Sequence, residues 1–202
     1  MSLRFALLGF LTTEPASGYR LAQEFGESMG WFWYASHSQI HPELQRLEDE
    51  GLVSSEVLDD DGRGKRLFSI TRAGREQLDH WLSQSTDYAP VRDVERIRLI
   101  FLDQQPPEVI RKHFEAHLDH HQHLLDIYSG QLREIHQGTF PRLRKRLASQ
   151  PESTHEYVAG LKALALQGNV MRARNEIAWA EDALLWLDAL ANSEGPAGND
   201  QH

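Results

Sequence analysis

A seven-residue repeat between residues 108 and 137 constrains the fold of this chain more than any other feature of its sequence. Two interleaved series have this spacing: Phe114, His121, Tyr128 and Ile135, and, offset by four, Leu118, Leu125 and Leu132. Side chains spaced alternately by four and three residues lie along one face of an α-helix, as in helices that pair along their length. The repeat therefore predicts a long helix that buries one stripe against another long helix.

A second long helix is expected from about Thr154 to Ala191, where apolar residues again recur every seven positions. Trp179 and Trp186 lie on a neighbouring stripe, so this helix is apolar over a wide arc, as expected of a helix buried against more than one partner. We expect residues 106–192 to form an antiparallel dimerisation domain in which the long helices of two subunits pair. The predicted dimer contacts are Phe114, Leu118, His121, Leu125, Tyr128, Leu132, Leu164, Met171 and Leu185.

The first 85 residues predict three short helices followed by a β-hairpin and a fourth helix. The first helix is expected at Leu3 to Leu11 and the third from about Ser38 to Glu50. The second is expected to follow an N-cap at Ser17 and to be ended by Gly26 and Gly30. Two strands, 52–58 and 66–71, flank the turn Asp61-Gly62-Arg63-Gly64. Helix, helix, helix and hairpin is the order of a winged helix-turn-helix. The chain is therefore predicted to be mainly α with a small β-hairpin wing, with a linker and connecting helix at 86–105 and a disordered tail at 193–202.

The composition excludes several classes of site. The chain has 202 residues and no cysteine, which rules out disulfides, thiolate nucleophiles and Cys-based zinc or iron–sulfur sites. It also lacks the G-x-S-x-G, H-E-x-x-H and phosphate-binding glycine-loop motifs of common enzyme classes. We therefore predict no catalytic residues and no cofactor. No apolar run is long enough to span a membrane and no basic leader is present, so a cytoplasmic protein is expected.

Double-stranded DNA is the partner that the winged-helix order predicts, although the net charge of −9 argues against indiscriminate binding to nucleic acids. In the third helix, Ile40, Leu44 and Leu47 form one apolar stripe and leave a polar face opposite. Glutamine and arginine can form bidentate contacts with adenine and guanine, and cations at the hairpin tip can contact phosphates. The predicted DNA contacts are Ser38, Gln39, His41, Pro42, Gln45 and Arg46 on the helix, and Arg63, Lys65 and Arg66 on the wing.

Three segments resemble the PadR family of bacterial transcriptional regulators. They are LRFALLGFLTTEPASGYRLAQEF at 3–25, WYASHSQIHPELQRLEDEGLV at 33–53 and RLFSITRAG at 66–74; APVRD at 89–93 is similar to the junction in longer-tailed members. The resemblance covers residues 1–192. It implies a homodimer that binds an inverted-repeat operator, represses adjacent genes and in some members responds to a small-molecule effector. His41 stands where the family commonly has a tyrosine that faces DNA.

Two further features leave alternatives open. His113, His117 and His121 (or His120) are spaced by four on one helix, a pattern that fits either solvated or packed histidines or a metal-responsive regulator. Trp31, Trp33 and Tyr34 fit either core packing or an effector pocket. The acidic composition also fits an adaptor or scaffold dimer that binds protein instead of DNA.

Overall fold

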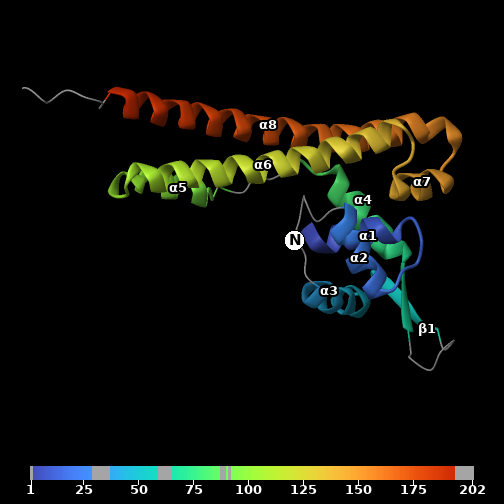
Figure 1. Cartoon of the computed structure of the whole chain (residues 1–202). Coiled ribbons are helices and arrows are strands. Elements are labelled where there is room, and N and C mark those ends of the chain that lie inside the picture. Colours follow the sequence, from blue (N-terminus) through green and yellow to red (C-terminus); the bar gives the residue numbers. More distant parts are fainter. Residues whose placement is uncertain (1, 29–36, 59–64, 87–89, 91, 194–202) are drawn as a thin grey trace, which may run out of the picture. The chain divides into compact units, whose positions relative to one another are not determined.

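The structure is a computed structural model that describes residues 2–28, 37–58, 65–86, 90 and 92–193 (Figure 1). The chain divides into two compact units, Met1–Tyr88 and Ala89–His202. The first unit contains α1 (Ser2–Leu11), α2 (Gly18–Ser28), α3 (His37–Asp49), β1 (Val53–Leu58), β2 (Lys65–Ile70) and α4 (Arg72–Ser83). No helix in these described ranges is both long and apolar enough to cross a lipid bilayer.

The predicted winged helix-turn-helix is confirmed in the first unit. Strands β1 and β2 pair antiparallel, with Val53 opposite Ile70 and Leu58 opposite Lys65. Ala16 adds a short bridge to this hairpin, because its N–H donates to the Phe68 carbonyl at 3.0 Å and its carbonyl accepts from Phe68 at 2.9 Å. The helices and the hairpin share one core, built from Phe5, Leu7, Leu8, Phe10, Leu11, Leu21, Phe25, Ile40, Leu44, Leu47, Val53, Phe68 and Leu78, among others.

Local sequence signals determine where these helices begin and end. Ser17 Oγ accepts the Arg20 N–H at 3.3 Å at the start of α2, and Thr71 Oγ1 accepts the Gly74 N–H at 3.1 Å at the start of α4. Gly51 follows α3 with a φ of +72°, the left-handed conformation that glycine adopts without strain. α2 continues past Gly26 to Ser28, and Gly30, the second glycine expected to end it, lies outside the described residues.

Gly74 occupies a position where a side chain does not fit. A Cβ atom there would lie 2.1 Å from the Leu52 carbonyl oxygen and 2.9 Å from Ile70 Cγ1. We expect Gly74→Ala to lower the free energy of unfolding of the first unit by about 3 kcal/mol, because the backbone must shift to accept the methyl group. Urea denaturation followed by circular dichroism measures this change. Gly9→Ala is the matched control, since a Cβ at Gly9 meets no atom within 4 Å, and unchanged stability in Gly74→Ala would contradict the prediction.

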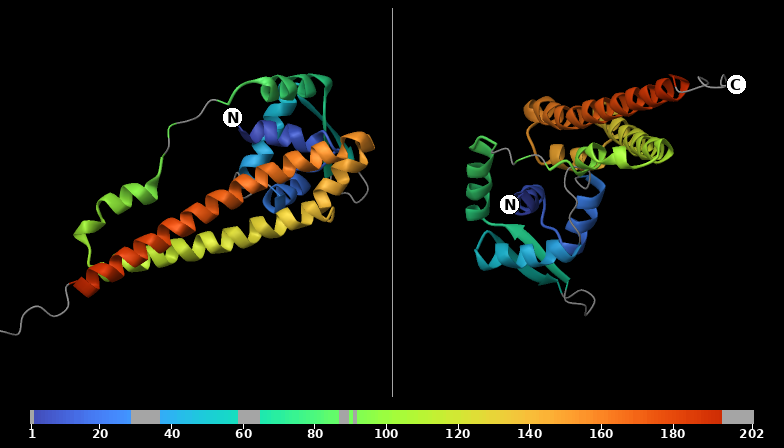
Figure 2. Two further views of the ribbon diagram at one scale, coloured as in Figure 1. Left: turned by 90° about the horizontal axis from the view of Figure 1, so that it is seen from above. Right: turned by 90° about the vertical axis from the view of Figure 1, so that its left-hand side faces the viewer.

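The second unit is an antiparallel pair of long helices with shorter helices packed on it. It contains α5 (Val94–Ile100), the 3-10 helix η1 (Leu102–Gln104), α6 (Pro107–His136), α7 (Pro141–Ala148), η2 (Glu152–Thr154) and α8 (His155–Ser193). α6 and α8 run side by side along their length (Figure 2). The two long helices were expected from the sequence, whereas α7 was not.

Two separate apolar clusters hold α6 against α8. One surrounds Phe114, Ala180 and Leu187, and the other surrounds Tyr128, Leu166 and Val170. Between them along the helices, the contact is made by His117 and His121 of α6 and Glu176 of α8, whose ligand-type atoms lie within 4.8 Å of one another. A polar layer therefore interrupts an otherwise apolar interface.

The repeat on α6, which was expected to pair with a second subunit, packs against α8 of the same chain. Phe114 and Tyr128 are buried against α8, and Leu118, His121, Leu125 and Leu132 are half-buried in the same interface. The matching stripe on α8 is Leu166, Ala173, Ala180 and Leu187. The turn through α7 brings α8 back beside α6. Because α8 is in the same chain, its effective concentration at the repeat of α6 is high, and it covers this repeat.

The α8 residues predicted for dimerisation lie on the opposite side of that helix. Leu164, Met171 and Leu185 are 64%, 63% and 66% exposed, so they are not part of the contact with α6. Tyr157, Leu161, Trp186 and Leu190 extend the same exposed apolar surface. We call Leu161, Leu164, Met171 and Leu185 the outer stripe of α8.

Candidate nucleic-acid interface

Helix α3 has one buried face and one polar, exposed face. Ile40, Leu44 and Leu47 are 1%, 0% and 0% exposed and anchor the helix in the core of the first unit. The opposite face exposes all six predicted helix residues: Ser38, Gln39, His41, Pro42, Gln45 and Arg46. The structure therefore brings these six side chains together on one surface that begins at the N-terminal end of the helix, where backbone N–H groups favour an anion.

Arg66 connects the hairpin to the C-terminal part of α3. Its Nη2 donates to Glu48 Oε2 at 2.5 Å and to Ser55 Oγ at 2.7 Å, and its Nη1 donates to Gln45 Oε1 at 3.2 Å. The guanidinium also lies 5.3 Å from the centre of the Phe68 ring. Arg66 was expected at the tip of the wing, but it lies on β2 opposite Val57, and its charge is paired with a carboxylate.

Glu48 is the acceptor at the centre of this network. The hydrogen bond from Ser55 Oγ, 2.6 Å from Glu48 Oε1, lowers the pKa of Glu48; burial opposes this, and the hydrogen bond and charge of Arg66 lower it further. Glu48 is therefore ionised at neutral pH and holds Arg66 in place. Gln45 Nε2 also donates to Glu48 Oε2 at 3.3 Å, so one carboxylate orients two predicted DNA-contacting side chains.

Arg46 is the most exposed cation on this face of α3. Its Nη1 lies 3.3 Å from Glu43 Oε2, and its side chain is 71% exposed. An ion pair this exposed contributes little free energy, so Arg46 can exchange it for a phosphate or a guanine at small cost.

Several predicted residues lie outside the part of the chain that the structure describes. Arg63 falls in the range 59–64, and Trp31, Trp33 and Tyr34 fall in the range 29–36. Lys65 is the first residue of β2, but its side chain is not described. The wing tip and the effector pocket therefore stay predictions from the sequence.

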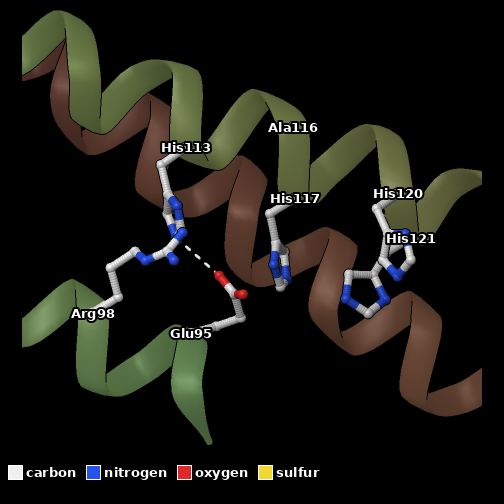
Figure 3. Close-up of a pocket in the computed structure, with 7 residues that line it drawn as sticks. All are labelled: Glu95, Arg98, His113, Ala116, His117, His120 and His121. Atoms are coloured by element: carbon white, nitrogen blue, oxygen red, sulfur yellow. Dashed lines mark ion pairs between the residues drawn. The ribbon is translucent and has the colours of Figure 1, made fainter.

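The histidines form a second polar cluster, in the other unit. His113, His117, His120 and His121 line one side of a cavity of about 410 Å³, and Glu95 and Arg98 of α5 line the other (Figure 3). Burial is the main cause that lowers the pKa of His121, and the neighbouring His117 and His120 lower it further. Sequence reasoning missed Glu176, which α8 brings to His117 Nε2 at 3.3 Å.

Two family models match this chain, one for each unit. Residues 7–80 match the model for the transcriptional regulator PadR-like family, and residues 91–188 match the model for the virulence activator alpha C-terminal region. The virulence activator AphA of Vibrio cholerae, a solved structure, is 30% identical, with 93% of this chain and 99% of that chain covered and a TM-score of 0.67. This chain belongs to the PadR-like family of transcriptional regulators.

Relatives from Bacillus subtilis agree with this membership of the PadR-like family. The negative transcriptional regulator PadR of that organism is 28% identical over 188 residues, which cover 92% of this chain and 97% of that protein. Its crystal structure in complex with operator DNA matches with a TM-score of 0.73 and 25% identity, covering 93% and 98% of the two chains. The same protein has been solved in complex with p-coumaric acid, and that structure matches with a TM-score of 0.63 and 26% identity.

Proposed function

We propose that this protein is a homodimeric repressor that binds an inverted-repeat operator through α3 and the wing of each subunit. The observation that carries the proposal is the two-faced α3. One face is fixed in the core, and the other exposes Pro42 and five polar side chains along a surface that begins at the N-terminus of the helix. Helix-turn-helix proteins read the major groove with the N-terminal part of such a helix.

The roles within the interface follow from the chemistry of each side chain. Arg46 and Gln45 can contact base edges, while Ser38 and Gln39 lie at the end of α3 that suits a phosphate. Arg63 and Lys65 would add phosphate contacts from the wing. Glu48 keeps Arg66 and Gln45 oriented and limits the positive charge of the surface.

A second copy of this chain is the partner proposed for the outer stripe of α8. The stripe repeats with the spacing that helices use to pair, and its leucine and methionine side chains are exposed in the single chain. Dimers of helix-turn-helix proteins place their two recognition helices in successive major grooves, about 34 Å apart or a multiple of it, and we propose the same for the two α3 helices. The operator is then an inverted repeat.

A small organic effector is proposed to release the protein from its operator. The B. subtilis relative solved with p-coumaric acid is 26% identical to this chain over 93% of its length, which supports this step without identifying the compound. A screen of aromatic acids against the protein–DNA complex, read by fluorescence anisotropy, tests it.

The salt dependence of DNA binding tests the contribution of the wing. Each protein–phosphate contact adds about 0.9 to the slope of log K against log salt concentration, so Arg63→Ala plus Lys65→Ala should flatten the slope by up to about 4 per dimer. The measurement is anisotropy with labelled DNA from upstream of the protein's own gene. Affinity should fall similarly for operator and unrelated duplexes, because phosphates carry no sequence information.

The matched control removes the same charge from elsewhere in the unit. Arg72 and Arg75 lie on α4, which packs on α1, and Arg72→Ala plus Arg75→Ala should leave the slope near the wild-type value. A wing variant with the wild-type slope would show that the wing does not contact DNA. A wild-type protein that binds no upstream DNA would instead favour the adaptor interpretation.

A further inference from the structure

The α6–α8 interface contains a half-buried polar layer, formed by His117, His121 and Glu176, that is separate from the exposed face of α3 and from the outer stripe of α8. His121 occupies a position of the seven-residue repeat that is otherwise apolar or aromatic. The side chains of His117 and Glu176 are only 8% and 16% exposed. Polar side chains cost free energy when buried without partners, so they are retained in such a layer only where they are satisfied or have a function.

The layer is incompletely satisfied by hydrogen bonds. Nδ1 of His121 is buried and makes no hydrogen bond to any described residue. The rings of His117 and His121 lie 4.4 Å apart between centroids, a spacing that the i, i+4 relation on α6 provides. Both rings are on the face of α6 that meets α8, and Figure 3 shows them side by side.

Glu176 completes a set of three donors from two helices. One ligand atom from each of His117, His121 and Glu176 lies within 4.8 Å of the other two. A tetrahedral zinc ion with bonds of about 2.0–2.1 Å needs its ligand atoms about 3.4 Å apart, so small rotamer changes would bring the three together. His117 Nε2 and Glu176 Oε2 are already 3.3 Å apart.

Arg96 of α5 also contacts this carboxylate and shares Glu176 Oε2 with His117. Its Nη2 donates to both oxygens of Glu176, at 3.1 and 2.8 Å, while its guanidinium lies 4.5 Å from the centre of the Trp179 ring. Burial, the largest effect, raises the pKa of Glu176, but the hydrogen bonds and charge of Arg96 outweigh it and the pKa is lowered overall. An ionised carboxylate fixed by an outer hydrogen-bond donor is the usual arrangement of a metal-ligating carboxylate.

We propose that His117, His121 and Glu176 bind a divalent transition-metal ion, with zinc as the best match, in a site between α6 and α8. Two imidazoles and one carboxylate form a nitrogen and oxygen donor set that suits zinc and has the composition of known three-ligand zinc sites. The cavity beside His117 and His121 leaves room for a water molecule as the fourth ligand. The proposal does not depend on DNA binding.

Metal titration of the full-length, chelator-treated protein tests the site. Zinc binding is measured by competition with a fluorescent zinc indicator, and cobalt(II) serves as a spectroscopic substitute because its visible absorption reports ligand number. The wild type should bind about one zinc ion per chain with a Kd in the micromolar range or below. It should also give the intense cobalt absorption of a four- or five-coordinate site. His117→Gln and His121→Gln should each weaken zinc binding by at least about tenfold.

His123→Gln is the matched control, because His123 is exposed on the same helix and is not among the residues that line the cavity. It should keep the wild-type affinity, stoichiometry and cobalt spectrum, which separates the site from weak binding by the chain's 11 histidines. Helicity by circular dichroism checks that each variant is folded. Equal losses in all three variants, or a wild type that gives only the pale spectrum of octahedral cobalt, would overturn the proposal.

Discussion

Replacing Leu164 and Met171 by glutamate is expected to convert the protein from a dimer to a monomer and to weaken operator binding by about a hundredfold or more. The two side chains are 64% and 63% exposed in the single chain, so glutamate there leaves the α6–α8 core unchanged. In a dimer joined through the outer stripe, the same substitutions bury up to four charges without partners. Losing the dimer removes the gain from binding two half-sites at once, which is commonly a factor of 10² to 10⁴.

Light scattering coupled to size-exclusion chromatography measures the first effect, with twice 23.2 kDa expected for the wild type and 23.2 kDa for the variant. Leu164→Met plus Met171→Leu is the matched control, because it changes the same positions without adding charge and should stay dimeric. Circular dichroism should show the same helicity for all three proteins, since glutamate is a good helix former. A double-glutamate variant that keeps the dimer mass would show that the outer stripe is not the interface.

The sequence predicted where the long helices lie better than it predicted which helix packs against each of them. A period of seven identifies a long helix and the face it buries, whichever helix covers that face. It carries no information on whether the covering helix belongs to the same chain. Here α7 reverses the chain direction, and α8 takes the stripe that was assigned to a second subunit.

The face of α8 that meets α6 was not predicted, for a related reason. This helix is apolar around most of its circumference, so Leu164, Met171 and Leu185 have the same spacing as the buried Leu166, Ala173, Ala180 and Leu187. The residues that meet α6 are offset by two positions and include two alanines, whose small side chains bring the helices close. A pattern based on large apolar residues selects the outer stripe instead.

The candidate sites also differ in how far the sequence alone could predict them. The polar face of α3 was predictable because Ile40, Leu44 and Leu47 alone determine which side is exposed. The contact between Arg66 and Glu48, 18 residues apart, depends on the hairpin register, which places Arg66 opposite Val57 of β1, the strand that packs on α3. Glu176 is 55 residues from His121, and only the antiparallel alignment of α6 with α8 brings the two together.

Neutralising Glu48 is expected to make the protein bind unrelated DNA about tenfold more tightly and to reduce its preference for the operator. In Glu48→Gln, Arg66 loses the carboxylate that pairs with it at 2.5 Å, and each subunit gains one positive charge beside the recognition face. If Arg66 then reaches a phosphate, the slope of log K against log salt concentration steepens by about 2 per dimer. The hydrogen bond of Gln45 to residue 48 loses its ionised acceptor at the same time, which weakens the orientation needed for base contacts, while its bond to Asp49 Oδ1 at 3.0 Å remains.

Anisotropy with operator and scrambled duplexes over a range of salt concentrations measures both effects. Glu76→Gln is the matched control, because Glu76 pairs with Arg72 on the exposed surface of α4 and its loss changes the net charge equally. That variant should keep the wild-type salt slope and specificity. If Glu48→Gln also keeps them, Arg66 does not face DNA, and the C-terminal end of α3 lies away from the duplex. If only binding to unrelated DNA strengthens, Glu48 reduces non-specific binding in the wild type by pairing with Arg66. A paired cation contributes less to phosphate binding than an unpaired one.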